Sequence, residues 1–566
     1  MQRVTPTLNL EPFKGFATSS LGWPLLSTKH IRALEVAYAN QRQEQSKQNQ
    51  SNPALGSAQA PRSQPTLMET AGLSLAKLCL ALAPNARQIW IACGPGNNGG
   101  DGLVAAIELK KLGKDAYVSL CGKRLNSPAI SNDPKTLKTS SITDHMSAQQ
   151  AALELGIDLH FDAPSYWDFA IDALLGIGID QHNPRPIEGV MADWLSLINS
   201  SDSPVLCVDT PSGLCTDTGH MSLIRTQSQE HTLNFNQKRF TLTFLGLKPG
   251  LFTGAGKDYS GEVWLDTLDW IDTAQRQVSL GAHPLTDPVI YLNSTPRITS
   301  RAHNSHKGTY SDVVVLGGAK GMQGAAVLAA TSALHMGAGR VYLCYLDESP
   351  SNVGLNPALM TRFLSDLPAL ILEPASFVCG CGAGKEITTH LRLVLSTSKN
   401  LVLDADALNA VAEDEQFKKL LSARSASGLH TVLTPHPLEA ARLLGITTQQ
   451  VQVDRVQCAK DLARVFRCAV VLKGSGTVIA QYDGLNHKHS ERVCINPTGC
   501  ALLASAGTGD VLAGMIAALL AQSADPWLSA CEAVFIHGLT AQNWGVKDSF
   551  DSTLLAERVT YPRLRN

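Results

Sequence analysis

The chain has 566 residues, of which 44% are hydrophobic and 17% are charged, and its formal net charge at pH 7 is -2. A chain of this length exceeds what one hydrophobic core organises, so we expect two or three domains. The composition is that of an ordinary globular protein and excludes a largely disordered one. Because the charge is so nearly balanced, the chain offers no basic surface for nucleic acid or for an anionic membrane, and we expect neither as a partner.

The compartment is indicated by the cysteines and by the absence of targeting signals. The 13 cysteines are scattered and form no CxxC pair, which is typical of a reducing compartment. Cys379 and Cys381 alternate along an expected strand, which favours buried free thiols over a metal site. No apolar run is long enough for a transmembrane helix, and the first residues lack the apolar core of an export signal. We therefore expect a cytoplasmic protein.

In chain order, the first feature is a polar segment between two expected helices. Helical patterns occupy residues 29–40 and 67–82, and residues 41–65 between them are rich in Gln, Ser, Asn and Pro. Such a segment buries too little apolar surface to order itself, so we expect a flexible insertion there.

After this insertion, apolar strands alternate with helices through the rest of the chain. In the first half, strands are expected at residues 89–93, 117–121, 169–174 and 205–209. After a linker at residues 276–298, strands are expected at 313–316, 340–344, 377–379, 401–403, 431–433 and 470–472, with helices at 325–336 and 511–522. This alternation predicts parallel sheets covered by helices. The sequence therefore predicts two α/β domains, over residues 1–275 and 299–566.

The most informative segment is GPGNNGGDG at residues 94–102, directly after the first of these strands. Glycine accumulates where the backbone turns sharply or approaches a ligand closely, so we expect a loop here rather than core packing. A helix is expected to follow, from about Leu103 to Gly113. In an open α/β sheet, ligands bind at such a turn because the N–H groups of the helix start face them. The segment thus predicts a nucleotide-like ligand.

Two further polar loops follow strands of the same expected sheet. One begins at Asp172, and the other contains Asp209 and Ser212. A doubly wound sheet brings such loops into one crevice. Their carboxylate and hydroxyl oxygens, together with the amide oxygens of the first loop, are hard ligands that suit an alkali or alkaline-earth ion. Each aspartate alone could equally be a helix cap or a turn former, but three such loops in one sheet favour a site.

The second half has its own set of polar loops. AGTGDV at residues 506–511 opens a helix, so its backbone N–H groups could surround a phosphate. Asp510 could then orient or deprotonate a hydroxyl that attacks this phosphate. The chain has no Gly-Lys-Ser/Thr of a P-loop. Alternatives remain open: Asp510 as an N-cap, His436 between two prolines as a rigid surface turn, and Lys473 as a solvated strand end.

Taken together, these segments resemble one family, the bifunctional NAD(P)H-hydrate repair enzymes, which fuse an NAD(P)HX epimerase to an ADP- or ATP-dependent NAD(P)HX dehydratase. The first half is similar to the epimerase through LMETAG, GPGNNGGDG, DALLGIGI, CVDTPSG and GLKPG. The second half is similar to the dehydratase through HKGTY, LDADAL, TPHPLEAARLL, LKGSGT and AGTGDVLAGM. The motifs stand in family order over most of residues 20–560. The resemblance implies a Rossmann-like doubly wound parallel sheet in the N-terminal domain and a ribokinase-like α/β fold in the C-terminal domain.

The resemblance also implies roles for individual residues. Asp209 and Asp510 would be catalytic, a K⁺ ion would be held by Asn98, Asp172 and Ser212, and Mg²⁺ would accompany ADP or ATP in the second domain. The residues implied to contact the hydrated substrate in the epimerase are Asn97, Asn98, Gly99, Gly100, Asp101, Gly176, Ile177, Gly178, Ile179, Asp180, Gln181, His182 and Asp209. Those implied to contact it in the dehydratase are Ala325, Gly382, His436 and Asp510. Those implied at the adenine nucleotide are Lys473, Gly474, Ser475, Gly476, Thr477 and Gly509.

The chain departs from the family pattern at two places that matter here. The first helix of the family normally continues directly into LMETAG, so residues 41–65 are an insertion. Where the family usually has Gly-Pro-Gly-Leu-Gly, this chain has Gly-Cys-Gly-Ala-Gly at residues 380–384. Such differences bear on nucleotide preference rather than on the assignment.

The implied activity is the repair of NADHX and NADPHX, the hydrated and inactive forms of the reduced cofactors. The first domain would exchange the R and S epimers, and the second would dehydrate the S epimer. We expect ADP as the co-substrate because the uninterrupted fusion is typical of prokaryotes, and a homo-oligomer because the family tends to assemble. One alternative is a ribokinase-class small-molecule kinase. Another makes the first domain a non-catalytic binding module, which would be expected to lose the acidic residues that are present here.

Overall fold

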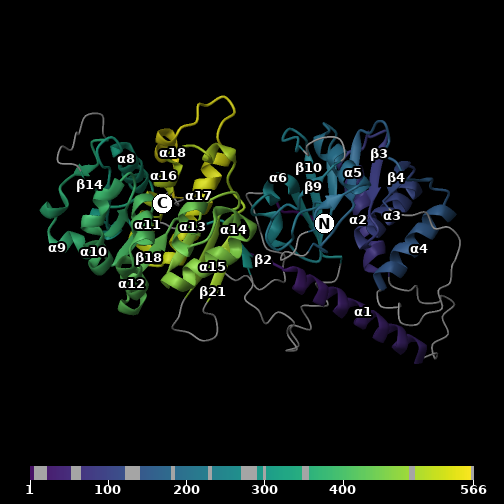
Figure 1. Cartoon of the computed structure of the whole chain (residues 1–566), viewed down its shortest axis with the longest axis horizontal. Helices are drawn as coiled ribbons and strands as arrows, with labels where there is room; N and C mark the ends of the chain where they lie inside the picture. The colour runs from purple at the N-terminus through teal and green to yellow at the C-terminus, as the bar shows by residue number, and fades with distance from the viewer. Residues whose placement is uncertain are drawn as a thin grey trace. The chain divides into compact units, whose positions relative to one another are not determined.

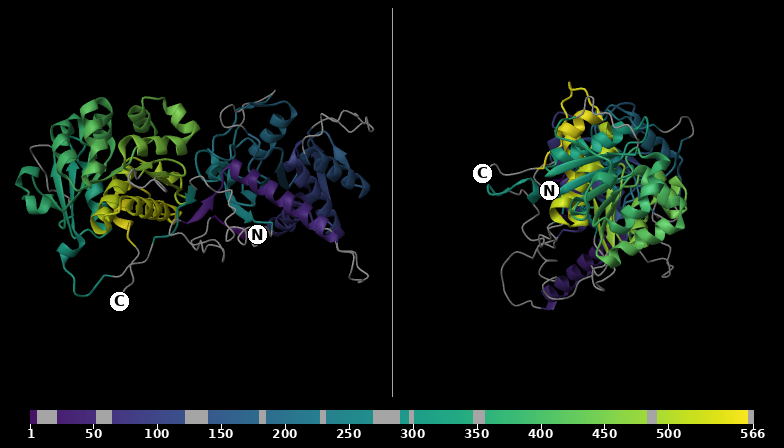
Figure 2. Two further views of the ribbon diagram at one scale, coloured as in Figure 1. Left: turned by 90° about the horizontal axis from the view of Figure 1, so that it is seen from below. Right: turned by 90° about the vertical axis from the view of Figure 1, so that its left-hand side faces the viewer.

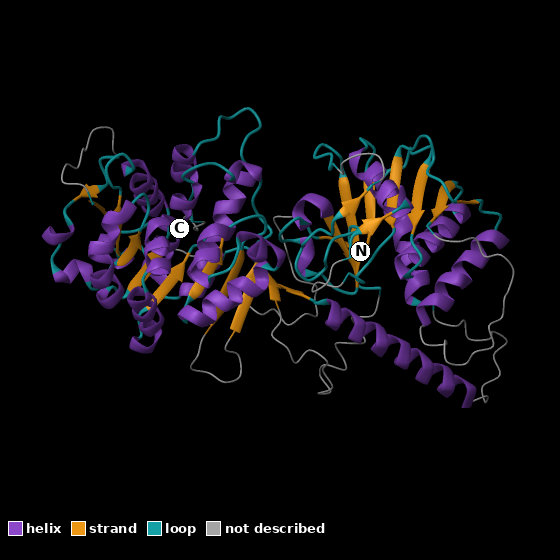
Figure 3. Cartoon of the chain, in the orientation of Figure 1, coloured by secondary structure: helices purple, strands orange, loops and turns teal. Residues whose placement is uncertain are grey.

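A computed structural model of the protein describes residues 1–5, 22–51, 65–121, 140–179, 185–226, 232–268, 290–296, 301–346, 356–482 and 491–561. These residues divide into two compact units: unit 1 contains residues 1–5 and 24–268, and unit 2 contains residues 22–23 and 290–561. In each unit, helices pack on a sheet of mostly parallel strands (Figure 3). The expected α/β class is confirmed for both halves of the chain.

The sheet of unit 1 has the order β1-β11-β10-β8-β6-β3-β4-β5, and the described pairs are parallel except for β1 with β11. The chain enters the middle of the sheet at β3, moves outward to β4 and then crosses back to β6. Ligands bind at such a reversal of strand order in doubly wound sheets, which places the loops after β3 and β6 at the expected crevice. The strands are β1 (Gln2–Arg3), β3 (Ile89–Cys93), β4 (Ala116–Leu120), β5 (Leu159–His160), β6 (Phe169–Ala173), β8 (Val205–Val208), β10 (Arg239–Phe244) and β11 (Glu262–Asp266), with β7 (Ile187–Glu188) and β9 (Ile224–Arg225) paired separately.

Two helices of unit 1 are longer than expected: α1 continues past its expected end, and α3 begins before its expected start. They are α1 (Thr28–Ser51), α2 (Leu67–Leu82), α3 (Asn97–Lys111), α4 (Ser140–Glu154), α5 (Val190–Ser200) and α6 (Gly256–Ser260). Figures 1 and 2 show α1 as one unbroken helix, so the first eleven residues of the expected flexible insertion are helical. Residues 52–64 of that insertion lie outside the described residues.

The glycine-rich segment opens α3 instead of preceding it. The helix begins at Asn97, with Gly96 as its N-cap, six residues before the expected start. A Cβ atom on Gly99 would lie 1.8 Å from the carbonyl oxygen of Gly94, and one on Gly102 would lie 2.8 Å from the Cβ of Ala173. These glycines therefore let the helix start pack tightly against its preceding turn and against β6. The expectation of a loop without core packing was wrong for this part of the segment.

The sheet of unit 2 has the order β15-β14-β13-β16-β17-β18-β19-β20-β21-β12. It is parallel up to β19, whereas β20 pairs antiparallel with both β19 and β21. The strands are β12 (Ile290–Leu292), β13 (Asp312–Gly317), β14 (Arg340–Tyr345), β15 (Met360–Thr361), β16 (Ser376–Cys379), β17 (Asn400–Leu403), β18 (His430–Leu433), β19 (Ala469–Leu472), β20 (Val478–Tyr482) and β21 (Glu491–Ile495). The short strand β2 (Trp23–Leu25) includes the point in the sequence at which the two units divide. Strand β12 falls inside the stretch expected to be a linker and pairs with β21.

Two of the helices in unit 2 pack closely against each other. Helix α16 (Thr508–Ser523) is buried along most of its length and packs on α8 (Gln323–His335), as Figure 1 shows. A Cβ on Gly514 would lie only 2.0 Å from the carbonyl oxygen of Ala329. The other α-helices are α9 (Ala369–Leu372), α10 (Thr388–Thr397), α11 (Ala405–Glu413), α12 (Glu415–Ala423), α13 (Pro437–Leu444), α14 (Thr448–Val453), α15 (Arg455–Phe466), α17 (Pro526–Gln542) and α18 (Ser552–Arg558).

Over the part of the chain that the structure describes, no helix combines the length and the apolar character needed to cross a membrane.

Candidate functional site

In unit 1, Asn98 connects the ends of three neighbouring strands. It lies in the first turn of α3, after β3, and its Nδ2 donates hydrogen bonds of 2.8 Å to the carbonyl oxygens of Leu175 and Val208. Its Oδ1 faces Gly176, because a Cβ there would lie 2.7 Å from this oxygen. The expected convergence of the three loops is therefore present, and Gly176 leaves room beside the amide oxygen.

Asp172 and Ser212 form a buried pair next to Asn98. The Ser212 hydroxyl donates to Oδ1 of Asp172 over 2.6 Å, and the Ser212 N–H donates to Oδ2 over 3.0 Å. Ser212 Oγ also accepts from the N–H of Leu175 over 2.8 Å. Burial raises the pKa of Asp172, and within the described residues this carboxylate forms no salt bridge. The residues thus offer carboxylate, amide and hydroxyl oxygens, which fit a monovalent or divalent hard cation.

Asp209 follows β8 in a backbone conformation that is unusual for a residue with a side chain. Its φ is +62°, in the left-handed region, and its carboxylate accepts hydrogen bonds from the N–H of Phe244 (3.0 Å) and from the Thr243 hydroxyl (3.3 Å). Strain of this kind persists where the surrounding structure enforces it, often at functional sites. The carboxylate also pairs with the ammonium group of Lys248.

Lys248 was not predicted as a site residue, although it lies in the GLKPG segment. Its side chain is 0% exposed, and besides Asp209 it donates hydrogen bonds of 2.9 Å to the Thr243 hydroxyl and the Phe244 carbonyl. A buried ammonium group needs such partners because its desolvation is costly. A lysine inside an otherwise apolar segment was the available signal.

Two further carboxyl groups lie near Asp209. Burial and the charge of Asp209 raise the pKa of Asp101 in α3 well above its usual value. The same two causes raise the pKa of Glu35 in α1. Glu35 is a site residue that sequence reasoning missed, because one acid in a helical pattern is normally a surface residue. Of the other expected contacts in unit 1, Asn97 is exposed beside this group, whereas Asp180, Gln181 and His182 lie outside the described residues.

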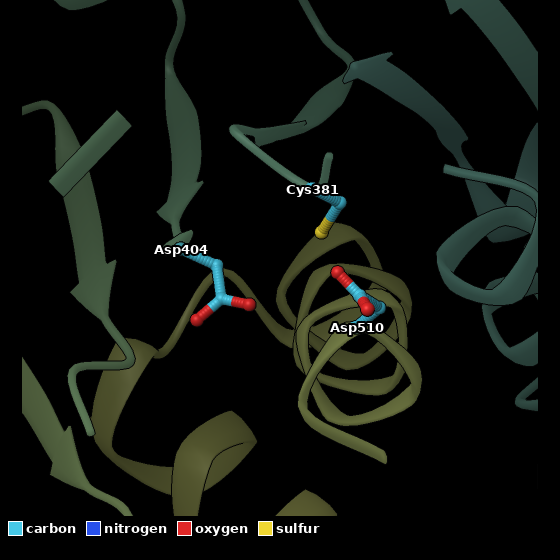
Figure 4. Close-up of side chains that lie close together, drawn as sticks. All are labelled: Cys381, Asp404 and Asp510. Carbon is cyan, nitrogen blue, oxygen red and sulfur yellow. The ribbon is translucent and has the colours of Figure 1, made fainter. Parts of the chain in front are cut away.

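In unit 2, three elements bring Cys381, Asp404 and Asp510 together, as Figure 4 shows. Cys381 follows β16, Asp404 follows β17, and Asp510 lies in the first turn of α16. One ligand atom of each residue lies within 4.8 Å of the others. Both Cys379 and Cys381 are buried free thiols, as expected. Asp404 was quoted in a motif but was not predicted to act at the site.

Lys473 is tied to this group and is not a solvated strand end. Its Nζ lies 2.6 Å from Oδ1 of Asp404, which also accepts a 2.7 Å hydrogen bond from the Thr434 hydroxyl. A Cβ on Gly509 would lie 3.2 Å from the same Nζ, so a larger residue there would crowd the lysine. Lys473 and the start of α16 therefore form one site.

Asp510 is not the N-cap of α16 either. The cap is Gly507, whose φ is +86°, and no side chain caps this helix start. Burial and the neighbouring charge of Asp404 raise the pKa of Asp510 to about 6, although Cys381 and Lys473 act in the opposite direction. A carboxyl group that titrates near neutrality beside free helix N–H groups can exchange a proton with a bound hydroxyl.

His436 caps a helix and keeps part of its ring exposed. Its Nδ1 caps α13, accepting from the N–H groups of Leu438 (3.1 Å) and Glu439 (3.2 Å). Its side chain remains 46% exposed, so its ring can still contact a ligand. Glu439 beneath it is 3% exposed, and burial raises its pKa to about 7.

The turn at residues 473–477 is shaped by Arg455, a buried residue not predicted for the site. Its Nη2 donates 3.1 Å hydrogen bonds to the carbonyl oxygens of Leu472 and Lys473. A Cβ on Gly474 would lie 2.8 Å from the guanidinium group, so only glycine fits against it. Two other residues expected at the substrate, Gly382 and Ala325, lie next to each other, because a Cβ on Gly382 would lie 2.9 Å from the Cβ of Ala325.

Comparison with known proteins assigns both units. Residues 64–250 match the family model described as YjeF-related protein N-terminus, and residues 313–560 match the one described as NAD(P)H-hydrate dehydratase. The bifunctional NAD(P)H-hydrate repair enzyme Nnr of Coxiella burnetii is 33% identical over 507 residues, which cover 88% of this chain and 94% of that protein. The chain belongs to the bifunctional NAD(P)H-hydrate repair enzymes.

Further similar proteins include a second bifunctional enzyme, a separate dehydratase and a solved structure. The bifunctional NAD(P)H-hydrate repair enzyme Nnr of Escherichia coli is 33% identical over 487 residues, 84% of each chain. The ADP-dependent (S)-NAD(P)H-hydrate dehydratase of Neisseria meningitidis is 38% identical over 256 residues, 43% of this chain and 80% of that protein. Among solved structures, the ADP/ATP-dependent NAD(P)H-hydrate dehydratase of Bacillus subtilis, crystallised with ATP/Mg²⁺, is 28% identical, with a TM-score of 0.37 and coverage of 46% of this chain and 91% of that chain.

Proposed function

We propose that this member of the family repairs NADHX and NADPHX in two steps: unit 1 exchanges the R and S epimers, and unit 2 dehydrates the S epimer at the expense of ADP. The observation that carries the proposal is the placement of Asp510, a half-buried carboxyl group with a pKa of about 6, at the open start of α16 and next to the Lys473–Asp404 pair. A non-catalytic binding module would be expected to lose the acidic residues of unit 1. All of them are retained, which argues against this alternative.

The dehydration has one chemical obstacle, because hydroxide is a poor leaving group. Asp510 takes the proton from the hydroxyl of the S hydrate while this oxygen attacks the terminal phosphoryl group of the nucleotide. The N–H groups at the start of α16 stabilise the charge on the transferred group, and Lys473 lies beside them. The transfer releases the rest of the nucleotide, AMP when ADP is the donor. The C–O bond of the resulting phosphate ester then breaks to release phosphate, and loss of a proton from the neighbouring ring carbon restores the double bond. Mg²⁺ enters as part of the nucleotide substrate.

The epimerisation is assigned to the Asp209 group in unit 1. Asp209 acts as acid and base at the reacting centre, and Lys248 fixes the orientation of its carboxylate through a buried ion pair. Asn97 to Asp101 and the segment from Gly176 to His182 hold the rest of the hydrated dinucleotide. Lys248 is a positioning residue in this scheme.

We assign a K⁺ ion to Asn98, Asp172 and Ser212, because the buried Asp172 carboxylate and the Asn98 Oδ1 beside Gly176 fit a hard cation. A bound K⁺ would neutralise Asp172 and fix the loops that follow β3, β6 and β8. Asp209 lies in the loop after β8, so fixing these loops would also align its carboxylate with the substrate.

One assay tests the two-step proposal. A mixture of R- and S-NADHX is incubated with the protein and ADP or ATP in the presence of Mg²⁺, and the return of the reduced-nicotinamide absorbance is followed. Recovery of both epimers supports the proposal. Recovery that stops at the S fraction would reduce unit 1 to a binding module, and no recovery with either nucleotide would contradict the dehydratase assignment. Faster recovery with ADP than with ATP supports the proposed co-substrate.

A further inference from the structure

Position 381 carries a thiol where the family that the sequence resembles usually has a proline. The Cys381 side chain is buried, and Figure 4 shows its sulfur pointing toward the carboxylates of Asp404 and Asp510. Proline has no side-chain donor, so the substitution introduces a hydrogen-bonding group into the dehydratase site.

The backbone around Cys381 leaves this side chain little freedom to move away. The Cys381 carbonyl accepts a 3.0 Å hydrogen bond from the N–H of Gly318, and a Cβ on Gly317 would lie 2.3 Å from the same oxygen. Gly380, with φ of +117°, packs against the end of β17, where a Cβ would lie 2.1 Å from the Asp404 carbonyl oxygen. These contacts fix the backbone from which the thiol extends.

The thiol is a donor and not a nucleophile. Burial, with the nearby charges of Asp510 and Asp404, raises the pKa of Cys381 well above its usual value, so the sulfur keeps its proton. Oδ1 of Asp404 is already engaged by Lys473 and Thr434. An oxygen of the Asp510 carboxylate lies within 4.8 Å of the Cys381 sulfur, and the neighbouring S–H lowers the pKa of Asp510.

We propose that Cys381 is a positioning residue for Asp510: its S–H donates to the carboxylate and holds that carboxylate toward the hydroxyl of the substrate. This inference rests on the proposed dehydratase function of unit 2. The other charged groups that act on Asp510 are Asp404 and Asp406, which favour its protonated form, and Lys473, which favours its ionised form. Cys381 adds a short-range contribution that neither salt nor a distant charge replaces.

The consequence is a pH dependence specific to this chain. Asp510 must be ionised to accept the proton, so kcat/KM for dehydration falls as the pH drops through the pKa of Asp510, near 6. Removing the donor destabilises the ionised carboxylate, so the acid limb of the profile moves to higher pH. A purely structural role for Cys381 would lower the rate or the stability without moving this limb.

The test compares the pH profiles of kcat/KM for S-NADHX with ADP in the wild type and in Cys381→Ala, Cys381→Pro and Cys381→Ser. Loss of the donor in the Ala and Pro variants is expected to raise the limb by roughly half a pH unit or more, whereas Ser, which keeps a donor, stays near the wild type. Cys379→Ala is the matched control, because Cys379 is a buried thiol in β16 two residues away. Epimer exchange by unit 1 in the same preparations checks for general damage.

Each outcome decides between the proposals. If the wild type dehydrates S-NADHX but Cys381→Ala and Cys381→Ser keep its acid limb, or both shift equally, the role of Cys381 is overturned and the proposed function stands. If the wild type dehydrates nothing with either nucleotide, both are overturned. Should Cys381→Pro not fold, the Ala and Ser variants still decide.

Discussion

Lys248 and Asp209, 39 residues apart in the chain, form a buried ion pair in the site of unit 1. Replacing one partner leaves the other charge buried and alone, so Lys248→Met is expected to lower the free energy of unfolding by about 3–5 kcal/mol. Urea unfolding measures this loss. Arg225→Met, which removes an exposed pair with Glu188, is the control and should change it by less than about 0.5 kcal/mol.

The double variant Asp209→Asn/Lys248→Met separates the pair from its surroundings. Because it leaves no lone charge, its loss of stability should be smaller than the sum of the two single losses. Additive losses would show that the two side chains do not act as a pair.

Asp510→Asn removes the proposed base while it keeps the size of the side chain. Dehydration of S-NADHX is expected to fall by about 10²–10⁴-fold, and exchange of the epimers should continue at the wild-type rate. Asp209→Asn is the reciprocal variant, which should lose exchange but still dehydrate the S epimer. If Asp510→Asn abolishes both reactions, the division of labour between the units is wrong.

The proposed K⁺ site predicts an ion dependence confined to one reaction. Exchange of the epimers should be slower when NaCl replaces KCl, and Asp172→Asn should raise the KCl concentration needed for half of the maximal exchange rate, because the variant lacks the buried negative charge. The rate of S-NADHX dehydration serves as the internal control in the same buffers. Equal exchange rates in KCl and NaCl would contradict the assignment.

Two glycines three residues apart in the same segment should respond differently to alanine. Gly99→Ala places a Cβ 1.8 Å from the Gly94 carbonyl and should destabilise unit 1 by more than about 2 kcal/mol, whereas a Cβ on Gly96 meets nothing within 4 Å. Thermal unfolding of the two variants compares them directly. Similar melting temperatures would mean that the turn before α3 relaxes freely.

Glu439 predicts a dependence of stability on pH. Its folded-state pKa, raised by burial to about 7, exceeds the ordinary 4.5, so the folded state holds the proton more tightly than the unfolded state does. This group therefore stabilises the fold below about pH 4.5 relative to higher pH, and that contribution, on the order of 3 kcal/mol, is lost as the pH rises from 4.5 through 7. Glu439→Gln should lack this loss, whereas Glu373→Gln, at an exposed residue, should follow the wild type.

The central strands and the loops after them could be predicted because parallel, fully buried strands are short continuous apolar runs. The run at residues 89–93 gave β3 without error, and the shared edge of the sheet then brought Asn98, Asp172 and Ser212 together. The start of α3 was missed because glycine has a low helix propensity, and only the close contact of Gly99 with Gly94 explains a helix there.

The roles of residues that act through tertiary contacts could not be predicted from the local sequence. Lys248, Glu35 and Arg455 are single charged residues, and their roles depend on burial and on partners from distant segments. The antiparallel strands β20 and β21 were not separated from the surrounding loops, because their apolar runs are short and interrupted. The homo-oligomer, the cytoplasmic location and the individual substrate contacts stay predictions.

The contact between α16 and α8 gives a reason for a second activity in the same polypeptide. Gly514 lets α16 approach the backbone of α8 closely, and this packing sets the position of the helix that carries Asp510. Inversion of one carbon moves the substrate hydroxyl to the opposite face of the ring, where a fixed carboxylate cannot follow it. Because unit 2 accepts one epimer only, complete recovery of the reduced cofactors requires that unit 1 convert the other epimer.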